Sequence, residues 1–404
     1  MKKKINISDT LYLGFFLVLW SVNGYFVGGN ALKYLILAVG LLMIFSYNIN
    51  GHLKKHKGWV EISIFTSLYF FLVIAKAFLQ EQYTTSPTII IFGVINVLLL
   101  ITGTLIAKNE SLIKFPNKKT IIIIFILTFV GAIFFFVFQS SLVVKVGTSG
   151  RAVGGEDDGV NVIGIAYTNA LIFIILFIIH RFLGKRSKLM SYTALALMLL
   201  SVLVIIQTQS RGAIIYLAII IFLFSFSGLK LQKAIPMLMR TFLYLFLGVL
   251  LIFAFIKINP GAQRSFDGFM NRMDDLVGSV QGTSVDRSSE EREDKYNDFF
   301  NNYDQYLFVG QKHYTPYPHN IFIEIIQRFG LILGIPLIIV ILACVIRATR
   351  YVYNKEPDMV LLLFSMVFLF SFFQSLSSMS LEMNRTLWLS MGVLFGKRNL
   401  VTNN

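Results

Sequence analysis

The stretch from Pro316 to Ile346 reads PYPHNIFIEIIQRFG followed by LILGIPLIIVILACVI, and it decides the fold class. The second half has no charged side chain and is long enough to begin crossing a bilayer as a helix. The first half places a histidine, a glutamate and an arginine directly before that apolar run. The sequence therefore predicts a membrane protein with polar, reactive groups at one membrane boundary.

Similar apolar runs recur along the whole chain. Its 404 residues are 56% hydrophobic and 14% charged. Only helices or closed barrels satisfy the backbone in lipid, and these runs are uniformly apolar rather than alternating. The expected fold class is all-α, a polytopic helical membrane bundle of about twelve transmembrane helices. The predicted spans cover 11–27, 31–47, 59–79, 88–107, 120–138, 162–180, 190–207, 212–228, 241–258, 330–346, 359–376 and 384–396.

Lysine and arginine predict the orientation, because cytoplasmic loops retain them. Most of them fall in connections on one side, from KKK at 2–4 to GKR at 396–398. Both termini are therefore predicted to be cytoplasmic. The net charge of +15 is explained by loops that face anionic lipid, so no nucleic-acid partner is expected.

Three parts are predicted along the chain. Residues 1–258 hold nine spans, 259–318 form a large extracytoplasmic loop, and 319–404 hold a loop-exit helix and three spans. Within the loop, apolar residues between Phe266 and Val277 predict an amphipathic helix. A second helix is expected from about Ser289 to Tyr303, with Tyr296, Phe299 and Phe300 as its buried face.

The predicted orientation leaves only His313 and His319 outside among the five histidines. His319 follows Pro318, and proline is favoured in the first helical turn, so we place His319 at or next to a helix N-terminus. The helix dipole there disfavours imidazolium. His319 is therefore the candidate general base.

The predicted helix after His319 has one polar face. Asn320, Glu324 and Arg328 recur every four residues, so they share a face that could line a water-accessible pocket at the membrane boundary. The alternative is an interfacial helix with a surface pair of Glu324 and Arg328.

External arginines are candidates for binding an anion such as a diphosphate. Arg211 lies in QTQSRGAIIYL, a short turn between two spans, where snorkelling to lipid headgroups is the alternative. Arg151 lies in a glycine-rich segment that could approach an anion, with Asn161 at the entry of the next span. The long loop adds Arg264, Arg272, Arg287 and Arg292.

No cofactor or metal is expected. The acidic pairs at 157–158 and 274–275 lack a histidine or third carboxylate at ligand spacing. The single cysteine, Cys344, excludes a disulfide framework within the chain. Serine-hydrolase and P-loop patterns are absent from the sequence, and the spans hold almost no carboxylates, which argues against an ion-coupled pump.

These motifs together resemble the O-antigen ligase and polymerase superfamily of bacterial glycan assembly. The resemblance rests on SRGA at 210–213, HN at 319–320 followed by GLILG, and SGRAVGG at 149–155. REDKY at 292–296 is similar to the family's arginine and aromatic pattern. The resemblance implies metal-independent, inverting glycosyl transfer from an undecaprenyl diphosphate carrier on the outer face of the bacterial inner membrane. The implied roles are base for His319, second candidate base for Glu324, diphosphate binding for Arg211, Arg292 and Arg151, and support for Asn161, Asn320 and Arg287.

Within this superfamily, the resemblance favours a polymerase of lipid-linked repeat units for O-antigen, capsule or exopolysaccharide. The ligase pattern is not complete, because Leu333 stands at its last position and Gly334 comes one place late. A ligase that uses lipid A core as acceptor is the first alternative, and a transporter or flippase is the second. The implied partners are undecaprenyl-diphosphate-linked glycans, the lipid bilayer, and chain-length regulator and flippase proteins of the same pathway.

Overall fold

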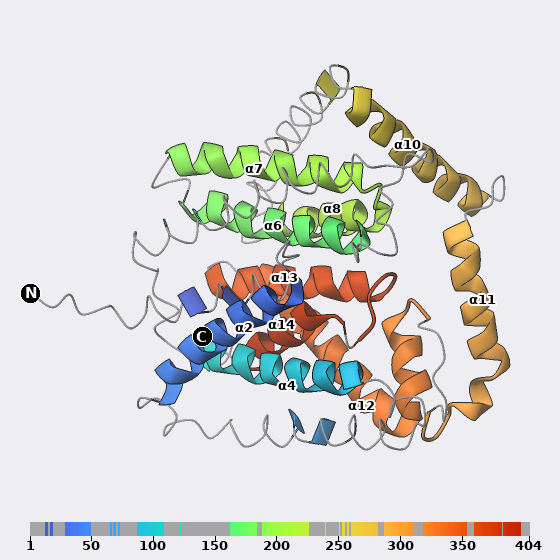
Figure 1. Cartoon of the computed structure of the whole chain (residues 1–404). Helices are drawn as coiled ribbons and strands as arrows, with labels where there is room; N and C mark the ends of the chain where they lie inside the picture. The colour runs from blue at the N-terminus through green and yellow to red at the C-terminus, as the bar shows by residue number, and fades with distance from the viewer. Residues whose placement is uncertain are drawn as a thin grey trace, which may run out of the picture. The chain divides into compact units, whose positions relative to one another are not determined.

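The protein is helical wherever its structure is described. The computed structural model describes residues 13–14, 17–18, 29–49, 65–66, 68–69, 72, 87–108, 122, 126, 162–183, 188–225, 239, 250, 253–254, 257, 260–281, 287–310, 318–353, 359–381 and 383–396. Every regular element in these ranges is a helix (Figure 1), as predicted. The predicted spans at 11–27, 59–79, 120–138 and 241–258 lie almost entirely outside the described residues.

Three of the described helices are long and apolar enough to cross a membrane. They are Ile163–Arg181, Lys188–Gln207 and Ile321–Val352. Shorter apolar helices lie at Tyr34–Ser46, Gly93–Ala107, Arg211–Phe224 and Val360–Ser375. Each of these helices coincides with a predicted span, which is compatible with a helical membrane protein.

The chain divides into two compact units. The first comprises residues 1–121, 291–351 and 360–404, and the second comprises 122–290 and 352–359. The first unit holds α2 (Gly29–Ile49), α4 (Pro87–Lys108), most of α11 (Arg287–Asn301), the 3-10 helix η4 (Tyr303–Gln305), nearly all of α12 (Ile321–Val352) and α13 (Met359–Ser375), and α14 (Arg385–Gly396). The second unit holds α6 (Val162–Leu183), α7 (Lys188–Gln207), α8 (Arg211–Ser225) and α10 (Pro260–Gln281). The predicted boundaries at 259 and 319 divide the chain into parts that lie within the membrane and a loop outside it, and they stay predictions.

In the first unit, α4 and α14 pack with their backbones in close approach (Figure 1). A Cβ at Gly103 would meet the carbonyl of Leu389, and a Cβ at Gly392 would meet that of Leu100. Thr104 Oγ1 also donates to the Gly392 carbonyl at 3.2 Å. Small residues that let helix backbones touch are typical of helix packing within membranes.

In the second unit, α6 packs against α7, and α8 and α10 complete the group. The amphipathic helix predicted near Phe266 is confirmed as α10, which buries Phe269. In the first unit, the second predicted loop helix is confirmed as α11, but its predicted buried face is wrong in part. Phe299 is buried and stacks on Tyr306, whereas the side chain of Phe300 is 62% exposed. Consecutive helical residues point about 100° apart, and Phe300 lies on the exposed side of the face that buries Phe299.

Candidate histidine site at the start of helix α12

The start of α12 is fixed by the side chain of Asn320. Its Oδ1 accepts hydrogen bonds from the backbone N–H groups of Phe322 at 2.9 Å and Ile323 at 3.4 Å. This is the geometry of an N-cap. His319 directly precedes the cap with a φ of 58°, so its side chain leaves the chain at a left-handed turn. The prediction that His319 lies next to a helix N-terminus is confirmed.

The surroundings of His319 favour its neutral form. Burial, followed by the positive charges of Lys295 and Arg292 on α11, lowers the pKa of His319 to about 4. Glu291 and a hydrogen bond to the Ser377 backbone oppose this shift without cancelling it. A ring N–H that donates to a carbonyl also fixes the tautomer, which leaves the other ring nitrogen as an acceptor. The neutral ring lies beside two cationic side chains, and its Nδ1 is enclosed by protein atoms.

One helical turn further, Glu324 and Arg328 form a buried ion pair. Glu324 Oε1 lies 3.0 Å from Arg328 Nη2, and Glu324 is 0% and Arg328 7% exposed. Glu324 Oε2 accepts a hydrogen bond from the Leu381 N–H at 2.9 Å. The alternative of a surface pair is therefore wrong, and the predicted lining of a water-accessible pocket is also wrong for these two side chains. The pair ties α12 to the segment between α13 and α14.

That segment, QSLSSMSLEMN at 374–384, includes structural residues that sequence reasoning missed. Asn384 Nδ2 donates to the Ser371 carbonyl at 2.8 Å and to Ser375 Oγ at 2.6 Å. Asn384 Oδ1 accepts from the Leu387 N–H at 3.2 Å and so caps α14. The sequence signal that could have identified these residues is a cluster of serines and an asparagine between two apolar runs. Because the segment contains Ser377, the network helps to position the contact of His319.

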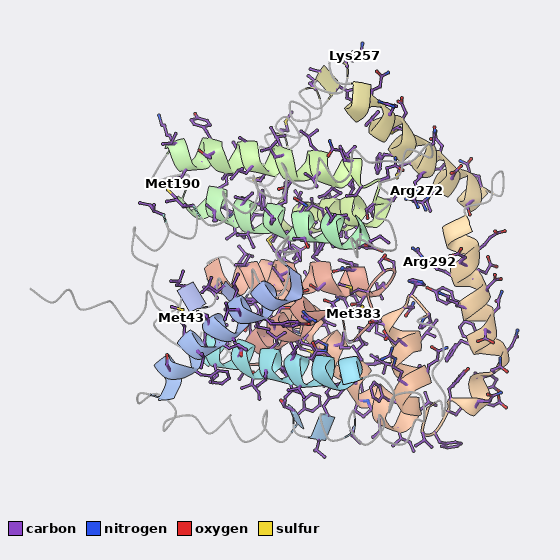
Figure 2. The ribbon with its side chains drawn as sticks, viewed as in Figure 1. Met43, Met190, Lys257, Arg272, Arg292 and Met383 are labelled. Carbon is purple, nitrogen blue, oxygen red and sulfur yellow. The ribbon has the colours of Figure 1, made fainter. Side chains whose placement is uncertain are left out.

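In the second unit, Arg211 and Arg272 are joined through the backbone. Arg211 Nη1 donates to the Arg272 carbonyl, and Arg272 Nη1 donates to the Gln209 carbonyl at 3.2 Å. A Cβ at Gly268 would meet the Gln209 side chain, so α10 lies directly on the turn before α8. Figure 2 labels Arg272 on α10. Sequence reasoning did not single out Arg272, because its spacing resembles that of the other loop arginines.

The remaining predicted site residues divide between described and undescribed parts. Arg292 lies on α11 in the first unit (Figure 2), and Arg287 is the first residue of α11. Arg151, Asn161 and His313 lie outside the described residues. Across the described ranges, no three His, Cys, Asp or Glu side chains are grouped so that they could hold a metal ion.

Comparisons with known proteins identify no relative. No family model, no curated protein and no solved structure matches the chain. The resemblance to the ligase and polymerase superfamily therefore stays a prediction from the residues that carry it.

Proposed function

We propose that the protein polymerises undecaprenyl-diphosphate-linked oligosaccharide units on the extracytoplasmic face of a bacterial inner membrane. A hydroxyl of the acceptor sugar attacks the anomeric carbon of the donor, and the bond from that carbon to the diphosphate oxygen breaks. The diphosphate leaves with the electron pair, and the hydroxyl proton passes to the protein. A single displacement of this kind inverts the anomeric configuration.

The observation that carries the proposal is the state of His319. A neutral imidazole with a fixed tautomer can receive the hydroxyl proton, and the low pKa of His319 keeps this form available at neutral pH. Lys295 and Arg292 lie close enough to influence that pKa. A diphosphate bound beside these cations would offset their charge and raise the pKa of His319, so the base would strengthen when substrate arrives.

Arginine pairs suit the other requirement of the reaction, which is to stabilise a diphosphate leaving group without a metal. Arg211 and Arg272 lie together in the second unit, where each guanidinium donates to a backbone carbonyl, and two neighbouring cations of this kind would support anion binding there. Arg292 supports the same role in the first unit, beside His319. Each assignment concerns its own unit and is tested by its own variant.

Glu324 was the second candidate for the base. Both of its carboxylate oxygens are engaged, one by Arg328 and one by the Leu381 N–H. A general base must be within reach of the substrate hydroxyl, and Glu324 is fully buried whereas His319 is half-buried. His319 is therefore the better supported base.

The test uses the membrane lipid fraction from host cells that lack the protein, because single lipid-linked units should accumulate there. This fraction supplies the host's own glycan, so the sugar sequence does not have to be chosen for the assay. The purified protein in nanodiscs should convert it into a ladder of longer lipid-linked products. His319→Ala and Arg211→Ala should abolish the ladder.

Two matched controls accompany the assay. His180→Ala removes a histidine that contacts Ser191 on the predicted cytoplasmic side, and Arg350→Ala removes an exposed arginine of α12 on the same predicted side. Both controls should retain the ladder. Products that form only after lipid A core is added would indicate the ligase, and no product with either acceptor from folded protein would contradict glycosyl transfer.

A further inference from the structure

The turn from Leu307 to Gly310 is locked onto the break in α12. The N–H of Leu331 donates to the Leu307 carbonyl at 2.7 Å. A Cβ at Gly330 would meet the Phe308 carbonyl and would lie 2.7 Å from the Gly310 nitrogen. Gly330 has a φ of 66° and a ψ of −176°, which interrupts the helix at this point. The turn and the break therefore form one rigid backbone contact within the first unit.

The same break separates two different surfaces of α12. Before it, the polar side chains Glu324, Gln327 and Arg328 are buried. After it begins an apolar stripe, in which exposed side chains follow at steps of three and four residues and so lie on one helix face. Its members are Ile332, Ile335, Ile339, Leu342 and Ile346. On a helix long enough to cross a membrane, this stripe is the face that lipid would contact, and it starts beside the turn.

On the turn itself, two large apolar side chains point outward. Phe308 is 70% and Val309 74% exposed, and Ile332, at the start of the stripe, is 64% exposed. Adjacent exposed apolar side chains are unfavourable in water and mark contact surfaces. Aromatic residues are also enriched at the boundary between headgroups and acyl chains.

We propose that Phe308 and Val309 insert into the bilayer leaflet that α12 enters at Leu331. Lipid, rather than a protein partner, covers these two side chains in this proposal. Backbone contacts fix the turn to the first residues of a span, so the turn lies at the depth where the apolar face of that span begins. The inserted turn would hold the segment before α12 at a set height above the membrane. This inference does not depend on the proposed glycan transfer.

The experiment measures the depth of the turn directly. Cys344 is the sole cysteine and is buried, so Cys344→Ala gives a background without thiols. Val309→Cys is labelled with a nitroxide, and the full chain is reconstituted in vesicles of phosphatidylethanolamine and phosphatidylglycerol. Power-saturation spectra then compare collision with oxygen, which concentrates in lipid, and with a water-soluble nickel chelate. Ile339→Cys, on the exposed stripe, gives the lipid reference, and Glu293→Cys, on an exposed position of α11, gives the water reference.

The expected ratio of oxygen to nickel accessibility at Val309 is several-fold above that at Glu293 and below that at Ile339. A ratio equal to that of Glu293 would overturn the proposal. The nitroxide could instead show low accessibility to both reagents, together with dipolar broadening that disappears on dilution with unlabelled protein. That result would overturn the proposal and would indicate that a second copy of the chain covers the turn. Phe308→Cys provides a second labelled site if Val309→Cys fails to fold, as judged by thermal unfolding and size-exclusion chromatography, and the same criteria apply.

Discussion

At the scale of single residues, His319 combines a backbone constraint with an electrostatic one. Its left-handed φ of 58° and the Asn320 cap set where the ring leaves the chain. Burial and the cations of α11 then set its protonation state. Proton transfer requires His319 to be correctly positioned and neutral. Variants that change either the position of the ring or its protonation state should therefore slow the proposed glycan transfer.

The lowered pKa of His319 predicts a specific pH profile. In the proposed reaction the neutral imidazole accepts the proton, so kcat/KM for glycan transfer should fall as pH drops through about 4 and stay level at higher pH. Arg292→Gln removes one positive charge, so it should raise the pKa of His319 and move this acidic limb to higher pH. The measurement is the pH dependence of initial rates for both proteins. An identical acidic limb in the two would contradict the assigned contact.

The same shift predicts an effect on stability. The pKa of His319 in the folded protein, about 4, lies below its ordinary value, so folding favours the neutral ring. The contribution is fully present above the ordinary histidine pKa of about 6.5 and is lost as pH falls towards 4. His319→Gln should therefore flatten the decline in melting temperature across this window, while His180→Gln should not.

Glu324 is predicted to be structural, through its buried contacts. Glu324→Ala removes the carboxylate from a buried ion pair, and breaking such a pair costs about 3–5 kcal/mol. Glu324→Gln keeps an oxygen that can accept from the Leu381 N–H, so its loss should be smaller. Denaturant unfolding in detergent measures both, with the exposed Glu293→Gln as the control. Equal stability of Glu324→Ala and the parent would contradict the buried pair.

At the scale of elements, the break in α12 is the feature that separates the polar helix from the span. The apolar pattern of the sequence placed the start of the span at Gly330, and the helix is interrupted there. The sequence could not predict the cause, because the interruption depends on a contact with Phe308 and Gly310, distant in sequence. Figure 1 shows α12 changing direction along its length.

This contact makes Gly330 sensitive to substitution. The φ and ψ of Gly330 belong to a region that other residues adopt at a cost of about 1–3 kcal/mol. A Cβ would in addition meet the Phe308 carbonyl, so Gly330→Ala should destabilise the protein by more than that strain alone. Gly334→Ala is the matched control, because its Cβ meets a side-chain methyl of Ile325 at 3.1 Å, which can shift. Thermal unfolding that ranks the two variants equally would contradict this contact.

At the scale of the whole molecule, the sequence predicted the class of fold and the ends of many helices, because apolar periodicity is a local property. Pro318 is also a local signal, and it correctly placed His319 next to a helix start, although α12 itself begins at Ile321. It could not predict that Glu324 and Arg328 are buried, since spacing on one helix does not reveal what covers that face. Arg272 was missed because only the fold brings it to Arg211.

The predicted orientation can be tested across the membrane. In the Cys344→Ala background, Glu293→Cys on α11 should react with a membrane-impermeant maleimide added to spheroplasts. Lys188→Cys, at the start of α7 and exposed, should react only after the membrane is permeabilised. The reverse pattern would contradict the assignment of α11 and His319 to the extracytoplasmic side.

The most direct measurement of the central claim is the single-turnover release of undecaprenyl diphosphate from lipid-linked units extracted from cells that lack the protein. The proposal predicts release by the parent and by His180→Ala, and loss of release in a folded His319→Ala variant. Release by His319→Ala at the rate of the parent would contradict the assignment of His319 as the base for glycan transfer.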